Sequence, residues 1–246
     1  MTRRLVEVSP GVLVATSRRD TTTSTVVRAT PASNEVLLVD PAWEPDELEA
    51  LADDLDELGL QVVAGFSTHA HFDHVLWHPR FGSPPRWASA ETARRATSSP
   101  TRDELLGELG PWPAELLPLV GDVAPLPGPG RLLPWQGQPV EVVVHDAHVP
   151  GHGALWLSGS RILLAGDMLS DVEPPLPATD DPAGFAAYLD GLETLRPFVE
   201  QAALVIPGHG HVGQDPKARL AADLRALDSL ARGRGLPPGD TRVAPA

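Results

Sequence analysis

The sequence contains no cysteine, and this absence limits both its covalent cross-links and its metal chemistry. Disulfide bonds are excluded, and so are the thiolate ligands that many structural zinc sites use. Any metal ion that this chain binds must therefore be held by nitrogen and oxygen atoms.

Positive charge is also scarce. Lys217 is the only lysine, and the 19 Lys and Arg residues stand against 33 Asp and Glu residues, which gives a formal net charge of −14. A nucleic-acid partner needs clustered basic side chains to neutralise its phosphates. We therefore expect no nucleic-acid partner, and a small-molecule substrate instead.

Long apolar runs are missing as well. No run approaches the roughly 20 residues that a helix needs to cross a bilayer. The segment 1–7 turns polar at once and lacks the apolar stretch and cleavage site of an export signal. These features predict a cytoplasmic protein without a membrane partner.

What the chain does contain is an ordinary globular balance of residues. At 246 residues with 42% hydrophobic content it is long enough to bury a substantial core. β-Branched and aliphatic runs between turn residues predict strands, and Leu48, Leu51, Leu55 and Leu58 at helical spacing predict an amphipathic helix. The predicted strands cover residues 12–14, 25–27, 35–39, 61–66, 140–144, 154–157, 161–165 and 202–206. The predicted helices cover residues 45–58, 91–97, 102–109, 182–195 and 216–231. Each half of the chain thus gives strands first and helices after, which favours an α/β sandwich.

One segment, at about 84–139, has little periodicity and many prolines. A stretch of this length is often a lid or substrate-covering insertion, although a tethered surface excursion is equally compatible with it. We treat 1–246 as a single domain with this possible insertion.

The strongest chemical signal is the run Thr68-His69-Ala70-His71-Phe72-Asp73-His74, directly after a predicted buried strand. Side chains two apart in an extended segment point the same way, so His69 and His71 are placed to bind one ion together. Asp73 and His74 are placed to face a second ion where the chain turns. Neutral imidazoles and carboxylates are ligands that Zn²⁺ accepts.

Three further candidates lie downstream at strand ends or turns. Glycines bracket His152 and His209, where the backbone can bend tightly, and Asp167 ends a predicted strand after Gly166. A carboxylate placed between two ions can bridge them. The alternative for each residue alone is a polar side chain at a strand end that only the backbone satisfies, but seven such residues at one edge would be costly to bury unpaired.

The order His-x-His-x-Asp-His, Gly-His, Gly-Asp and Gly-His resembles the ligand set of the metallo-β-lactamase superfamily. The resemblance implies an αββα sandwich of two mixed β-sheets flanked by helices, with the metals at the edge of the sheets. Carried over, it implies that His69, His71 and His152 bind one metal, that Asp73, His74 and His209 bind the other, and that Asp167 bridges both. Asp40, after Val39, resembles an aspartate that ends an early strand in that family, although it could equally cap the turn into Pro41.

The resemblance also implies a reaction. Two divalent cations would lower the pKa of a bridging water toward neutrality and hold the resulting hydroxide as nucleophile. Zn²⁺ is the first expectation, with iron or manganese as alternatives. Asp73 would be the catalytic residue that orients this hydroxide and carries a proton to the leaving group. We therefore expect a metal-dependent hydrolase.

Differences from the usual family pattern narrow the class of substrate that we expect. The absent export signal and the presence of Asp167 argue against antibiotic hydrolysis, and the shortage of basic residues weakens a glyoxalase II-like glutathione thioesterase. The bulky run 75–78 replaces small residues and predicts an apolar pocket wall, which favours a small ester, thioester or lactone. The alternative is a persulfide-dioxygenase-like oxidoreductase with one iron on His69, His152 and Asp167.

Several other residues have a simpler interpretation. For His78 and Trp77, a surface histidine and a core tryptophan are favoured over pocket residues. His145, His148 and His211 lie near predicted ligands, and solvent exposure is favoured over contacts that support the metal site.

Overall fold

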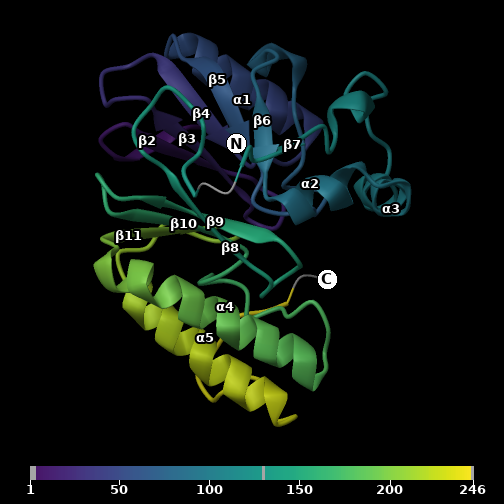
Figure 1. Cartoon of the computed structure of the whole chain (residues 1–246), viewed down its shortest axis with the longest axis vertical. Helices are drawn as coiled ribbons and strands as arrows, with labels where there is room; N and C mark the ends of the chain where they lie inside the picture. The colour runs from purple at the N-terminus through teal and green to yellow at the C-terminus, as the bar shows by residue number, and fades with distance from the viewer. Residues whose placement is uncertain (1–3, 129–130, 245–246) are drawn as a thin grey trace.

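Two β-sheets lie face to face and helices cover their outer faces (Figure 1). The computed structural model describes residues 4–128 and 131–244. Residues 1–3, part of the segment used above to argue against an export signal, and residues 129–130 within the predicted insertion lie outside this description.

The first sheet has seven strands in the order β1-β2-β3-β4-β5-β6-β7. Their bounds are β1 Val6–Ser9, β2 Val12–Thr16, β3 Thr23–Arg28, β4 Glu35–Val39, β5 Gln61–Phe66, β6 Arg86–Ala88 and β7 Ala124–Pro125. Strands β1 to β4 pair antiparallel, and β4 to β7 pair parallel, so the sheet is mixed.

The second sheet has four strands in the order β11-β10-β9-β8. Their bounds are β8 Glu141–His145, β9 His152–Leu157, β10 Ile162–Gly166 and β11 Leu204–Pro207. The β10–β11 pair is parallel and the other two pairs are antiparallel, so this sheet is mixed as well.

Five α-helices complete the described part of the chain, namely α1 Pro45–Glu57, α2 Ala90–Thr97, α3 Ser99–Leu109, α4 Pro182–Gln201 and α5 Pro216–Ala231. Two short 3₁₀ helices, η1 Pro79–Phe81 and η2 Leu117–Leu119, lie in the connections. No helix among the described residues combines the length and the apolar character needed to span a bilayer.

Three apolar clusters hold these layers together. Leu37 and Leu155 belong to a cluster that joins the inner faces of the two sheets. Leu51 and Leu38 belong to the cluster under α1, and Tyr188 and Leu163 to the cluster under α4. Successive side chains of a strand point alternately into the cluster between the sheets and into the cluster under a helix. Both faces of each sheet are therefore apolar, as expected for sheets that are covered on both sides. The predicted αββα sandwich is confirmed.

The segment 84–139 contributes two strands to the first sheet, β6 near its start and β7 at 124–125, and these strands pair with each other. Between them, Leu105, Leu109 and Val120 are buried in the same cluster as α1. These residues of the segment pack against the core, while the insertion and its two interpretations, a lid or a tethered surface excursion, remain predictions.

Two expectations about individual elements differ from the structure. Helix α4 continues to Gln201 through Pro197, six residues past the predicted end, with Leu195 and Val199 buried on the same face. The run 75–78 does not form an apolar pocket wall, because Val75, Leu76 and Trp77 are buried in the cluster under α1. Half-buried His78 accepts a hydrogen bond from Arg80 N at the start of η1, so the simpler interpretation of both His78 and Trp77 is confirmed.

Candidate metal centre

The candidate site lies where strands of both sheets end. The loop after β5 carries His69, His71, Asp73 and His74, and His148 lies in the turn between β8 and β9. Asp167 follows β10, and His209 follows β11. Since these strand ends meet at one edge of the sandwich, residues up to 140 positions apart in the sequence, from 69 to 209, come together in one site.

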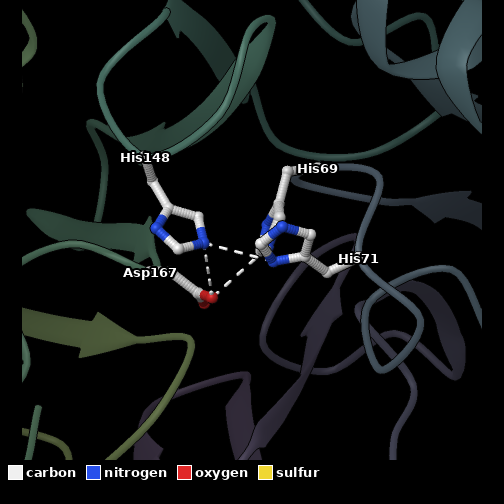
Figure 2. Close-up of side chains that lie close together, drawn as sticks. All are labelled: His69, His71, His148 and Asp167. Carbon is white, nitrogen blue, oxygen red and sulfur yellow. Dashed lines mark hydrogen bonds and ion pairs between the residues drawn. The ribbon is translucent and has the colours of Figure 1, made fainter. Parts of the chain in front are cut away.

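These side chains form two groups that could each hold a metal ion. The first group contains His69, His71, His148 and Asp167, and the second contains Asp73, His74 and His209, with the ligand atoms of each group within 4.8 Å of one another. Figure 2 shows the first group, with the ring nitrogens of His69, His71 and His148 turned toward the Asp167 carboxylate.

Distances within the first group are those of converging donors. His69 Nε2 lies 3.0 Å from His71 Nδ1, and His148 Nε2 lies 3.2 Å from the same atom. Asp167 Oδ2 lies 3.3 Å from His69 Nε2 and 3.4 Å from His148 Nε2.

The second group converges in the same way. Asp73 Oδ2 lies 3.4 Å from His74 Nε2 and 3.3 Å from His209 Nε2. Asp167 also reaches this group, because its Oδ1 lies 3.2 Å from His74 Nε2 and its Oδ2 lies 3.4 Å from His209 Nε2. The Asp167 carboxylate therefore lies between the two groups.

The structure groups one histidine differently from the predicted ligand set. His152 belongs to neither group, and His148 lies in the first group in its place. His152 Nε2 instead accepts a hydrogen bond from the main-chain N–H of Asp167 at 3.1 Å. The two histidines stand four positions apart across the Pro150-Gly151 turn, and this turn directs the earlier one into the site. One sequence feature could have identified His148, namely that it directly precedes the run Val149-Pro150-Gly151, which contains the turn.

The ligand candidates are held by contacts to their second ring nitrogen or to their carboxylate. His148 Nδ1 bonds to the carbonyl of Leu176 at 2.8 Å, and His209 Nδ1 bonds to the carbonyl of Asp20 at 2.9 Å. Thr22 Oγ1, fully buried, donates to Asp73 Oδ2 at 3.2 Å. Such outer contacts fix ring orientation at metal sites, and no sequence pattern pointed to Thr22 or Leu176.

Burial and charge give the two groups different proton affinities. Burial lowers the pKa of His69 well below its ordinary value and that of His71 to about 4, and it lowers the pKa of His148 too. Burial would raise the pKa of Asp167, but the charges of His74 and His209 hold it well below its usual range. Neutral imidazoles around an ionised carboxylate present free lone pairs to a cation.

The second group is more basic. Burial alone would lower the pKa of His74, but the carboxylates of Asp167, Asp73 and Asp40 outweigh it and raise this pKa to about 9. The pKa of His209 rises to about 11 because Asp167, Asp73 and Glu173 outweigh burial in the same way. A cation in this group would replace those protons as the partner of the carboxylates.

The residues fit divalent metal ions. Asp167 Oδ1 is buried and accepts no hydrogen bond from the described residues, although it forms an ion pair with His74 Nε2 at 3.2 Å. A metal ion would replace the His74 proton as the partner of this buried carboxylate oxygen. The donor set is nitrogen and oxygen only, which suits Zn²⁺ and also iron or manganese.

Comparison with known proteins points to one family. The model of the Metallo-beta-lactamase superfamily matches residues 18–213. No curated protein matches the sequence at the significance applied.

Solved structures of similar fold include three from bacteria. A beta-lactamase domain protein from Burkholderia ambifaria is 21% identical with a TM-score of 0.68, over 92% of this chain and 75% of that one. A metallo-beta-lactamase from Pontibacter korlensis is 19% identical with a TM-score of 0.65, over 92% and 99%. A metallo-beta-lactamase family protein from Thermus thermophilus is 22% identical with a TM-score of 0.64, over 92% and 80%. At these identities the likeness establishes the fold.

Proposed function

Because the chain belongs to the metallo-beta-lactamase superfamily, we propose that it is a hydrolase that uses two divalent metal ions, Zn²⁺ in the first place, to cleave a small ester, thioester or lactone. One observation carries the proposal. Asp167 Oδ1 lies 3.2 Å from His74 Nε2, and its Oδ2 lies 3.3 Å from His69 Nε2, so one carboxylate faces both groups.

In this proposal His69, His71 and His148 hold one ion, Asp73, His74 and His209 hold the other, and Asp167 contacts both. Two divalent cations held by these residues would lower the pKa of a water molecule toward neutrality and would polarise a substrate carbonyl oxygen. Asp73 is positioned for proton transfer as well as for metal binding, because the hydrogen bond from Thr22 Oγ1 holds its Oδ2 at the second group. We assign to Asp73 the proton that the leaving group needs.

Charge near the second group supports an uncharged substrate. Glu173 Oε1 lies 3.7 Å from His209 Nδ1, and the main-chain carbonyl of Asp20 bonds to the same nitrogen. Arg18 and Arg19, which precede Asp20 in the chain, are paired with Asp46 and Glu44. Anionic substrates such as glutathione esters would meet like charge here, which favours small neutral esters and lactones over a glyoxalase II-like role.

The test combines metal content with a substrate panel. The protein purified with added zinc should contain two metal ions per chain and hydrolyse members of a panel of thioesters, lactones and neutral esters. Removal of metal by a chelator should abolish turnover, and zinc should restore it. A protein with one tightly bound iron and persulfide oxidation would overturn the proposal in favour of the dioxygenase alternative.

A further inference from the structure

Three imidazole rings are stacked in a row that begins at His69 of the first group and continues through His152 to His145. The His69 and His152 ring centroids are 5.1 Å apart with planes inclined by 29°, and the His152 and His145 centroids are 4.7 Å apart with planes inclined by 27°. His145 and His152 are direct cross-strand neighbours on β8 and β9. The proposed chemistry assigns no role to the middle ring, although it is fully buried beside a proposed ligand.

The middle ring contacts the main chain of the residue that lies between the two groups. The Asp167 N–H donates to His152 Nε2 at 3.1 Å. A neutral imidazole that accepts at Nε2 carries its proton on Nδ1. His152 Nδ1 has no hydrogen-bond partner among the described residues, so this buried N–H is left unpaired. Burying an unpaired N–H costs free energy, and the ring nevertheless keeps the orientation that preserves its hydrogen bond with Asp167.

Gly166 and the His152 ring fit together at the turn that carries Asp167. Gly166 has a φ of +55°, and a Cβ at this position would lie 2.3 Å from His152 Nε2. The positive φ and the missing side chain both require glycine here. The ring therefore fills the space beside Gly166 and limits the directions that the next residue can take.

We propose that His152 is a positioning residue, which fixes the main chain of Asp167 through Nε2 and so places its carboxylate between the two metal-binding groups. The role toward metal rests on the proposed function, whereas the contact with Asp167 does not. The two oxygens of Asp167 face both groups, so a small rotation of its main chain would move the carboxylate away from one of them.

The contact itself is tested by NMR spectroscopy of the ¹⁵N-labelled full chain. A hydrogen bond from the Asp167 amide to His152 Nε2 transmits a scalar coupling between the two nitrogen nuclei. We expect this coupling in both the metal-free and the zinc-loaded protein. Its absence in both forms would overturn the proposal, whatever the protein hydrolyses.

The consequence for metal binding is tested with a matched set of variants. His152→Met fills similar space without an acceptor nitrogen, whereas His152→Gln carries an oxygen as many bonds from Cα as Nε2. We expect His152→Met to weaken zinc binding by about 10–100-fold, the typical effect of removing an outer contact at a metal site, and His152→Gln to recover most of the loss. Zinc affinity is measured by competition with a chromophoric chelator, and thermal unfolding of the zinc-free variants reports their folding.

His145→Met is the control, because His145 belongs to the same stack but makes no contact with Asp167. We expect it to leave zinc affinity at the wild-type value. Equal losses in His145→Met and His152→Met, or no recovery in His152→Gln, would show that His152 only fills space. A wild-type protein that binds no zinc would instead contradict the proposed function, and the NMR coupling would still decide the role of His152.

Discussion

Asp40 Oδ2 lies 3.0 Å from His74 Nδ1, and this contact turns the other ring nitrogen of His74 toward the second metal-binding group. Asp40 is buried with a φ of +47°, and its carboxylate also accepts from Thr68 N at 2.8 Å and Thr68 Oγ1 at 2.6 Å. The strand end at Val39 thus supports the site through His74. Of the two interpretations of Asp40, the contact that supports the metal site is the one observed.

Replacement of Asp40 by asparagine should weaken the second group selectively. Asn tolerates the positive φ and keeps the size of the side chain, but it removes the charge that holds the Nδ1 proton of His74. We expect zinc affinity at this group to fall by about 10–100-fold, as measured by chelator competition. Asp56→Asn, which changes an exposed carboxylate paired with Arg80, is the control. Unchanged zinc binding in Asp40→Asn would show that the contact does not support the metal.

Loss of His71 should abolish turnover and leave the fold intact. His71 Nδ1 lies 3.0 Å from His69 Nε2, so His71→Ala removes a proposed ligand from the centre of the first group. The ring is only half buried, and zinc-free His71→Ala should therefore unfold near the wild-type temperature. We expect kcat to fall by more than about 100-fold, since loss of a ligand exceeds the 10–100-fold effect of an outer contact. His211→Ala, at an exposed histidine paired with Asp171, should keep full activity. Wild-type turnover in His71→Ala would refute its assignment.

Metal content should distinguish His148 from His152 as a ligand. His148 Nε2 lies 3.4 Å from Asp167 Oδ2, whereas His152 belongs to neither group. We expect His148→Ala to bind one zinc ion per chain in place of two, as measured by elemental analysis after desalting. His152→Gln should retain two. The reverse pattern would restore the assignment that the family resemblance implied.

Acid should destabilise the zinc-free protein through His145. Burial lowers the pKa of His145 to about 4, with Asp146 acting to raise it and His148 to lower it, and its ring also stacks on His152. Because the pKa of His145 is lower in the folded state, burial of its neutral ring contributes fully to stability above pH 6.5, the ordinary pKa of histidine. This contribution is lost as the pH falls toward 4. At about 1.4 kcal/mol for each pKa unit, this loss is of the order of 3 kcal/mol.

The measurement is urea unfolding of zinc-free wild type and His145→Asn between pH 7 and pH 4.5. The Asn oxygen can take the place of His145 Nδ1, which accepts from Ala147 N at 3.3 Å. The variant should lose less free energy of unfolding than wild type over this range. Parallel curves for the two proteins would show that His145 does not contribute to the acid sensitivity.

Much of this protein was determined locally by its sequence. The run of three histidines and one aspartate after β5 lies in a single bent loop, where His69 and His71 share one group and Asp73 and His74 share the other. Leu48, Leu51 and Leu55 predicted α1 because helical spacing and core burial coincide there. These features depend on neighbours within a few residues, which a sequence shows directly.

Other features were decided only by the tertiary structure. The short strands β6 and β7 carry no alternation of their own, and they exist because the edge of β5 offers backbone partners to β6 and the edge of β6 offers them to β7. His148 and His152 stand in nearly equivalent local settings, and only the Pro150-Gly151 turn between two antiparallel strands decides which imidazole faces Asp167 and which one packs behind it. Which donors meet is a property of where strand ends from two sheets converge, and that convergence results from burial of the three apolar clusters across the whole chain.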